Sequence, residues 1–152
     1  MNRYDETMLA TAKLFGELSY CEKKKVGAVI AKEGRILATG YNGTVSGFDN
    51  TCETYDFLED KLVTSPYVIH AEQNALMFCT KNGIPTDGTT MYITLSPCAT
   101  CAKLLVQAGI KRVVFLEYYK DLGGLEFLQL AGVELLYWEV KQQEGFTLEK
   151  IK

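Results

Sequence analysis

The hydrophobic and polar positions along this chain follow the periods of both helices and strands. Residues 4–18 carry apolar side chains at helical spacing, which predicts an amphipathic helix. Residues 26–31 and 35–41 are extended apolar runs separated by a Glu-Gly turn signal, which predicts a β-hairpin. An Asn-Gly pair then ends the second strand in a loop.

The second half of the chain alternates helical and extended patterns. We expect helices at residues 71–80, 98–108 and 124–131, and strands at residues 91–95, 112–117 and 133–138. Between the two halves, residues 44–67 are polar and weakly periodic, with a short helix expected at 54–62. Residues 142–152 are polar and are expected to form a frayed tail.

This order of elements predicts an α/β fold. Strands that alternate with helices pair in parallel through crossover connections, whereas the hairpin adds an antiparallel pair. The five predicted strands should therefore form one mixed five-stranded sheet. The chain of 152 residues has the length of one ordinary domain, so we expect a single domain over residues 1–152.

Composition narrows the class of protein. The chain is 47% hydrophobic and 23% charged, which is typical of a soluble globular protein. The net charge is −3 and the only basic run is residues 23–25, which argues against a nucleic-acid polymer as partner. The sequence lacks an apolar stretch of membrane-spanning length, and its N-terminus does not resemble a signal peptide. We therefore expect a cytoplasmic protein with no membrane partner that acts on a small molecule.

The strongest chemical signal is H-A-E at residues 70–72 followed by P-C-A-T-C at residues 97–101. In a reducing compartment, closely spaced cysteines are more often metal ligands or catalytic groups than disulfides. His70, Cys98 and Cys101 offer one nitrogen and two sulfurs to a zinc ion. Three protein ligands leave a fourth position open, as in catalytic sites.

The predicted helices can bring these ligands together. Cys98 and Cys101 are three residues apart at a helix start, so they share one face, and the helix N-terminus favours their thiolate forms. His70 begins another helix, and two helix starts can lie at the same edge of a sheet. Zinc lowers the pKa of a bound water toward about 7. Glu72 is then available to carry protons in a hydrolytic reaction.

The pattern leaves other kinds of site open. A structural zinc site usually has four protein ligands, so it would have to recruit Cys21, Cys52 or Cys79. A C-x-x-C pair can also be a redox centre, but that chemistry has no use for the H-x-E element.

Taken together, these motifs resemble the deoxycytidylate (dCMP) deaminase family. H-x-E with P-C-x-x-C is the signature of zinc-dependent nucleobase deaminases in general. The resemblance to the dCMP branch lies in residues 25–30 (KVGAVI), 39–43 (TGYNG), 70–75 (HAEQNA), 91–98 (MYITLSPC) and 107–111 (QAGIK). It implies a three-layer α/β/α cytidine deaminase-like fold, and an activity that converts dCMP to dUMP and ammonia and supplies dUMP for thymidylate synthesis.

The resemblance also assigns roles to residues. It implies that His70, Cys98 and Cys101 bind the catalytic zinc and that Glu72 shuttles protons. Residues implied to contact the substrate are Lys25, Asn42, Ala71, Ser96 and Tyr119. The sequence leaves simpler roles open for three of these: a turn residue for Asn42, packing for Tyr119 and a solvated charge for Lys25.

Family members are commonly hexamers, and many are activated by dCTP with Mg²⁺ and inhibited by dTTP. The resemblance therefore implies a homo-oligomer with these effectors. Residues 44–50 (TVSGFDN) lack a proline and a second acidic residue that relatives often have, so the regulation is the least supported of these expectations.

Some relatives bind a second, structural zinc at positions that match Cys21 and Cys52. The histidine that helps to complete such a site is missing here, and Glu53, Asp56 or Asp60 could replace it. Two buried free thiols are the alternative.

Other functions stay open on sequence grounds. They are deamination of cytidine, dCTP or guanine, editing of a nucleic acid, and nucleotide binding without catalysis. The negative net charge argues against editing, and the intact Glu72 argues against lost catalysis.

Overall fold

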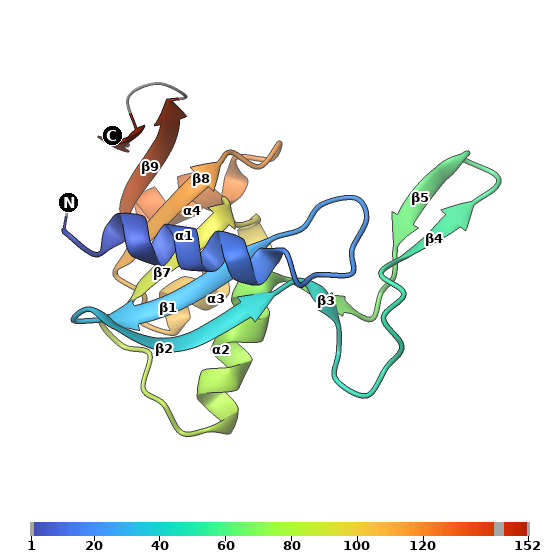
Figure 1. The fold of residues 1–152 in the computed structure, drawn as a ribbon, viewed down its shortest axis with the longest axis horizontal. Coiled ribbons are helices and arrows are strands. Elements are labelled where there is room, and N and C mark those ends of the chain that lie inside the picture. Colours follow the sequence, from blue (N-terminus) through green and yellow to red (C-terminus); the bar gives the residue numbers. More distant parts are fainter. Residues whose placement is uncertain (1, 142–144, 152) are drawn as a thin grey trace.

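The computed structural model of the chain describes residues 2–141 and 145–151. The helices are α1 (Asp5–Gly16), α2 (Ala71–Lys81), α3 (Ala99–Gln107) and α4 (Gly123–Leu130), and the strands are β1 (Gly27–Lys32), β2 (Arg35–Tyr41), β3 (Gly43–Thr44), β4 (Glu53–Asp56), β5 (Lys61–Thr64), β6 (Val68–Ile69), β7 (Thr90–Leu95), β8 (Arg112–Glu117), β9 (Glu134–Lys141) and β10 (Gly145–Lys150) (Figure 1). Within the described ranges, no helix is both long and apolar enough to cross a membrane.

The central sheet has the strand order β10-β9-β8-β7-β1-β2. Its five predicted strands are all present: β7, β8 and β9 run parallel, and β1 pairs antiparallel with both β2 and β7. The predicted α/β class with a mixed sheet is therefore confirmed.

A sixth strand, β10, pairs antiparallel with β9 at the sheet edge. The prediction of a frayed tail was therefore wrong for residues 145–150, and residues 142–144 and 152 lie outside the described part. In the sequence, Phe146 and Leu148 alternate with Thr147 and Glu149, which is a strand pattern.

The short helix predicted at residues 54–62 was also wrong, because this segment is the β4–β5 hairpin. The Asp56 Oδ1 atom accepts hydrogen bonds from the backbone N–H groups of Leu58 and Glu59, which fixes a turn between the strands. The flanking residues include aromatic and β-branched side chains, which favour strands. Figure 1 shows the hairpin extending away from the sheet and helices.

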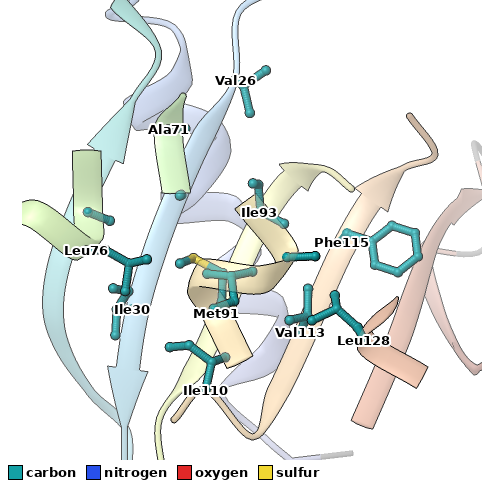
Figure 2. Packing of buried hydrophobic residues seen from close by; sticks show 14 of the residues in the cluster. Val26, Ile30, Ala71, Leu76, Met91, Ile93, Ile110, Val113, Phe115 and Leu128 are labelled. Atoms are coloured by element: carbon teal, nitrogen blue, oxygen red, sulfur yellow. The ribbon is translucent and has the colours of Figure 1, made fainter. Parts of the chain in front are cut away.

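Helices cover both faces of the sheet, which gives three layers. Alternate strand residues face opposite ways, so each face has its own core. Ile30, Met91, Val113 and Phe115 belong to the core that also contains residues of α2, α3 and α4 (Figure 2). The opposite face packs against Met8, Leu9 and Ala12 of α1.

Two glycines allow backbone segments near the site to approach each other. A Cβ atom at Gly40 would collide with the Ala71 carbonyl and the Ala75 nitrogen, so β2 lies directly against the first turn of α2. A Cβ atom at Gly124 would collide with the Pro97 carbonyl. The start of α2 is thereby held against β2, and the start of α4 is held against the segment that joins β7 to α3.

Candidate metal centre and active site

Three ligand atoms converge where α2 and α3 begin. The His70 Nδ1 atom lies 3.2 Å from the Cys101 Sγ atom and 3.7 Å from the Cys98 Sγ atom. His70 is the N-cap of α2 and Cys98 is the N-cap of α3. In the part of the chain that the structure describes, this is the one group of three or more His, Cys, Asp or Glu residues able to hold a metal ion.

Hydrogen bonds hold these helix starts in place. The Gln73 Oε1 atom accepts from the His70 backbone N–H at 2.8 Å. Asn74 Nδ2 donates to the Tyr41 carbonyl at 3.0 Å and so ties α2 to the end of β2. The Cys101 backbone N–H donates to the Cys98 sulfur at 3.5 Å, so the first turn of α3 fixes the position of that sulfur.

The donor set fits zinc. Tetrahedral zinc–nitrogen and zinc–sulfur bonds place the nitrogen and the sulfur roughly 3.6 Å apart, and the two observed distances lie on either side of that value. Cys101 is buried, Cys98 is half-buried and His70 is exposed, so the group is reached from one side only. An ion held here would have three protein ligands and one side facing the cavity.

The site environment shifts the titration of two of the ligands. The hydrogen bond and the charge of Glu72, together with the Cys98 sulfur, outweigh the effect of burial and raise the pKa of His70 to about 9. Burial raises the pKa of the Cys101 thiol, and the neighbouring Glu72 carboxylate adds to that rise. Without metal these groups retain protons, which a zinc ion must displace when it binds.

Glu72 is a buried carboxylate beside the ligands. Its side chain is 5% exposed, and its Oε1 atom lies 3.5 Å from the His70 Nδ1 atom. It is not a member of the ligand group. A carboxylate in this position can exchange protons with a reacting molecule instead of binding the ion.

A cavity of about 490 Å³ opens beside the ligands and Glu72, which is within the size range of small-molecule sites. The described residues that line it include His70, Ala71, Glu72, Cys98, Asn42, Ser96 and Tyr119 together with Lys23, Lys24, Glu53, Glu117 and Lys120. The structure therefore brings the predicted zinc ligands His70 and Cys98, the predicted proton carrier and four of the five predicted substrate residues to one cavity, and the third predicted ligand, Cys101, lies buried beside His70.

Lys25 is the predicted substrate residue that the structure places elsewhere, since it is not among the described residues lining the cavity. Lys23 and Lys24 line it instead, and Lys24 forms an ion pair with Glu117 at the end of β8. Neither Lys24 nor Glu117 was predicted from the sequence as a residue of the site. The available signal was that Glu117 ends a parallel strand, where ligand-contacting residues of α/β folds gather.

Two of the predicted substrate residues also shape the cavity wall. The Asn42 Oδ1 atom accepts from the Val26 N–H at 2.9 Å, and its Nδ2 atom donates to the Lys24 carbonyl at 2.8 Å. The Ser96 Oγ atom accepts from the Tyr119 N–H at 2.7 Å. Asn42 thus holds the segment before β1, and Ser96 holds the loop after β8.

Cys21 and Cys52 form a disulfide in this structure. Neither the predicted second zinc nor the alternative of two free thiols matches this arrangement, because disulfide sulfurs are not thiolate ligands. Glu53 was one of the residues considered for that zinc. Its carboxylate instead accepts the backbone N–H groups of Glu22 and Lys23.

The chain is similar to known proteins along most of its length. The family model of the cytidine and deoxycytidylate deaminase zinc-binding region matches residues 2–117. The deoxycytidylate deaminase of Enterobacteria phage T2 is 37% identical over 88% of this chain and 94% of its own length. The human deoxycytidylate deaminase is 41% identical over 78% of this chain and 67% of its own length.

Solved structures include a similar fold. The crystal structure of dCMP deaminase from the cyanophage S-TIM5, in complex with dCMP and dUMP, superimposes with a TM-score of 0.82 at 41% identity. The match covers 90% of this chain and 98% of that one.

Proposed function

Since the chain belongs to the cytidine and deoxycytidylate deaminase family, we propose that it is a zinc-dependent hydrolase that converts dCMP and water to dUMP and ammonia. One observation carries the proposal. His70, Cys98 and Cys101 converge at the wall of a nucleotide-sized cavity, with the buried Glu72 carboxylate beside them.

His70, Cys98 and Cys101 would hold the zinc ion, which supplies the Lewis acidity that makes water a nucleophile near neutral pH. The Glu72 carboxylate takes one proton from the attacking water and passes it to the cytosine ring nitrogen. It then takes the second water-derived proton from the hydroxyl of the tetrahedral adduct and passes it to the amino group, which leaves as ammonia. The Glu72 side chain is 5% exposed and lines the cavity, which places its carboxylate within reach of a base bound there.

The rest of the cavity supports a nucleoside monophosphate as substrate. Lys23, Lys24 and Lys120 line it and supply positive charge for a dianionic phosphate. The similar enzyme from cyanophage S-TIM5 was crystallised with dCMP and dUMP, which supports the same substrate and product here.

The first test compares dCMP with deoxycytidine. We expect kcat/KM for dCMP to be at least about tenfold higher, because hydrogen bonds to charged groups contribute roughly 1.5–3 kcal/mol each. The loss of cytosine absorbance and the release of ammonia measure both rates. Equal values for the two substrates would contradict phosphate recognition and with it the proposed substrate.

A second test separates two neighbouring lysines. Lys24→Ala should raise KM for dCMP about tenfold and leave KM for deoxycytidine nearly unchanged, because only dCMP carries the phosphate. Lys25→Ala is the matched control, because Lys25 is exposed and absent from the cavity wall that the structure describes. Equal effects of the two substitutions on KM for dCMP would contradict the assignment of the phosphate contact to Lys24 in preference to Lys25.

We also propose that the chain forms one cytoplasmic domain over residues 1–152, that it supplies dUMP for thymidylate synthesis, and that it works as a hexamer regulated by dCTP with Mg²⁺ and by dTTP. A second cavity, of about 200 Å³, is lined by residues of the Asn-Gly loop and supports an effector near it. Repeating the dCMP assay with each nucleotide tests the regulation, and sedimentation analysis tests the assembly.

A further inference from the structure

The wall of the substrate cavity includes a segment with no regular structure. Residues 17–26, which connect α1 to β1, form turns and irregular backbone. This segment nevertheless supplies Cys21, Lys23, Lys24 and Val26 to the cavity. Because it has no strand ladder of its own, its position depends on contacts with other parts of the chain.

Those contacts come from two sides. On one side, Asn42 binds the backbone at Lys24 and Val26, and the Ser19 hydroxyl donates to the Asn42 carbonyl at 2.7 Å. On the other side, Cys52 is bonded to Cys21.

The residue after Cys52 reinforces the disulfide. The Glu53 carboxylate accepts the N–H groups of Glu22 at 3.1 Å and Lys23 at 3.2 Å. Three consecutive residues, 21–23, are therefore attached to the base of the β4–β5 hairpin, one by a covalent bond and two by charge-assisted hydrogen bonds.

The hairpin itself has little other attachment to the body of the protein. Its two strands pair only with each other among the described strands, and Figure 1 shows it extending away from the layers. The Ser65 N–H donates to the Cys52 carbonyl at 2.6 Å and closes the base of the hairpin. Glu53 and Thr64 of this hairpin line the cavity, so the disulfide holds two parts of the cavity wall together.

We propose that the Cys21–Cys52 disulfide and Glu53 form a clasp that positions Lys23 and Lys24 at the substrate cavity, and that opening the disulfide weakens nucleotide binding without removing the catalytic groups. The inference rests on the proposed function. It gives the two cysteines a positioning role that differs from zinc ligation.

The chemistry of opening and closing is thiol–disulfide exchange. Closing oxidises the two thiols, and their two electrons and two protons pass to a small disulfide such as oxidised glutathione, which leaves as two thiols. Opening is the reverse reaction with a reductant. Cys21 and Cys52 are 3% and 2% exposed, so either reaction requires the hairpin base to separate first and should be slow.

The test compares the oxidised protein with protein treated with a phosphine reductant, in an assay of dCMP deamination. Reduction should raise KM for dCMP several-fold and leave kcat close to its starting value. Alkylation followed by mass spectrometry should find two more reactive thiols after reduction. Zinc content is measured in both samples, because a lost catalytic ion would lower kcat instead.

Two variants test whether the effect of the reductant comes from the Cys21–Cys52 disulfide. Cys52→Ala should show the raised KM without any reductant and should not respond to it further. Cys79→Ala, which removes a buried cysteine outside the cavity wall that the structure describes, should behave like the unchanged protein. A reductant effect that persists in Cys52→Ala would assign the effect to other cysteines.

The outcomes separate the two proposals. If the oxidised protein does not deaminate dCMP, the proposed function fails. If it does, and KM is unchanged by both reduction and Cys52→Ala, the clasp is overturned. A second zinc ion per chain, lost in Cys52→Ala, would also overturn it, because the two sulfurs would then be metal ligands.

Discussion

Replacing Glu72 with Gln should lower kcat for dCMP deamination by about 10²–10⁴-fold, the range that general acid–base catalysis supplies. The amide has nearly the same shape as the carboxylate but cannot accept and return the proton. The Glu72 side chain is buried and lies outside the ligand group, so the variant should retain its zinc. Elemental analysis and steady-state kinetics on the same sample measure both quantities.

Two further variants serve as the positive and negative controls for Glu72→Gln. Cys101→Ser should lose both zinc and activity, because it removes a buried ligand atom from the ligand group. Glu126→Gln changes an exposed carboxylate on α4 and should leave both unchanged. A Glu72→Gln protein with kcat within tenfold of the original would contradict the proton-carrying role, and one that lost zinc would make Glu72 a ligand.

The metal centre could be predicted from sequence because local rules place its ligands. Cys98 is separated from the end of β7 by two residues and caps α3, and His70 follows β6 and caps α2. Each side chain is fixed by its own element, and the α/β topology brings the two helix starts to the same place. The spacing of the three ligands in the sequence was therefore nearly sufficient to predict the metal centre.

The cavity wall was harder to predict because its geometry depends on distant contacts. Three consecutive lysines look equivalent in the sequence. The hydrogen bond from Asn42 to the Lys24 carbonyl and the ion pair between Lys24 and Glu117 place Lys24 at the cavity wall. These partners lie 18 and 93 residues away in the sequence, so no local pattern could identify them.

The β4–β5 hairpin and the Cys21–Cys52 disulfide were also hard to predict, because local sequence patterns do not show the contacts that form them. The apolar spacing of residues 54–62 is compatible with a short helix, and the side-chain hydrogen bonds of Asp56 decide the turn. Cys21 and Cys52 are 31 residues apart and joined through this irregular region. The cysteine count and the expected reducing compartment favoured thiols or metal ligands, and only the three-dimensional structure placed the two sulfurs together.

The other large expected effect concerns stability, at a buried ion pair between α1 and the sheet. Asp5 is fully buried and accepts hydrogen bonds from both terminal nitrogens of Arg112, at 3.2 and 2.9 Å. The Tyr92 hydroxyl donates to the same carboxylate at 2.6 Å. This group joins the first turn of α1 to β7 and β8, and so fixes one helical layer against the sheet.

Asp5→Asn should lower the free energy of unfolding by about 3–5 kcal/mol, because it leaves the buried Arg112 guanidinium without its counter-charge. Urea unfolding followed by the fluorescence of Trp138, the only tryptophan, measures the change. Glu6→Gln, on the exposed side of the same helical turn, is the matched control and should change it by less than about 0.5 kcal/mol. A loss below about 1 kcal/mol in Asp5→Asn would mean that Glu134 alone compensates Arg112.

The same ion pair predicts a pH dependence with a definite sign. Burial alone would raise the pKa of Asp5, but the hydrogen bonds from Arg112 and Tyr92 outweigh it and hold that pKa below its ordinary value of 3.8. A carboxyl group with a depressed folded-state pKa contributes stability above its unfolded-state pKa, and this contribution is lost as pH falls through the folded-state pKa. The stability difference between the original protein and Asp5→Asn should therefore be constant near neutral pH and shrink below about pH 4. A difference that persists undiminished at pH 2 would contradict the assignment of the stabilisation to the ionised carboxylate.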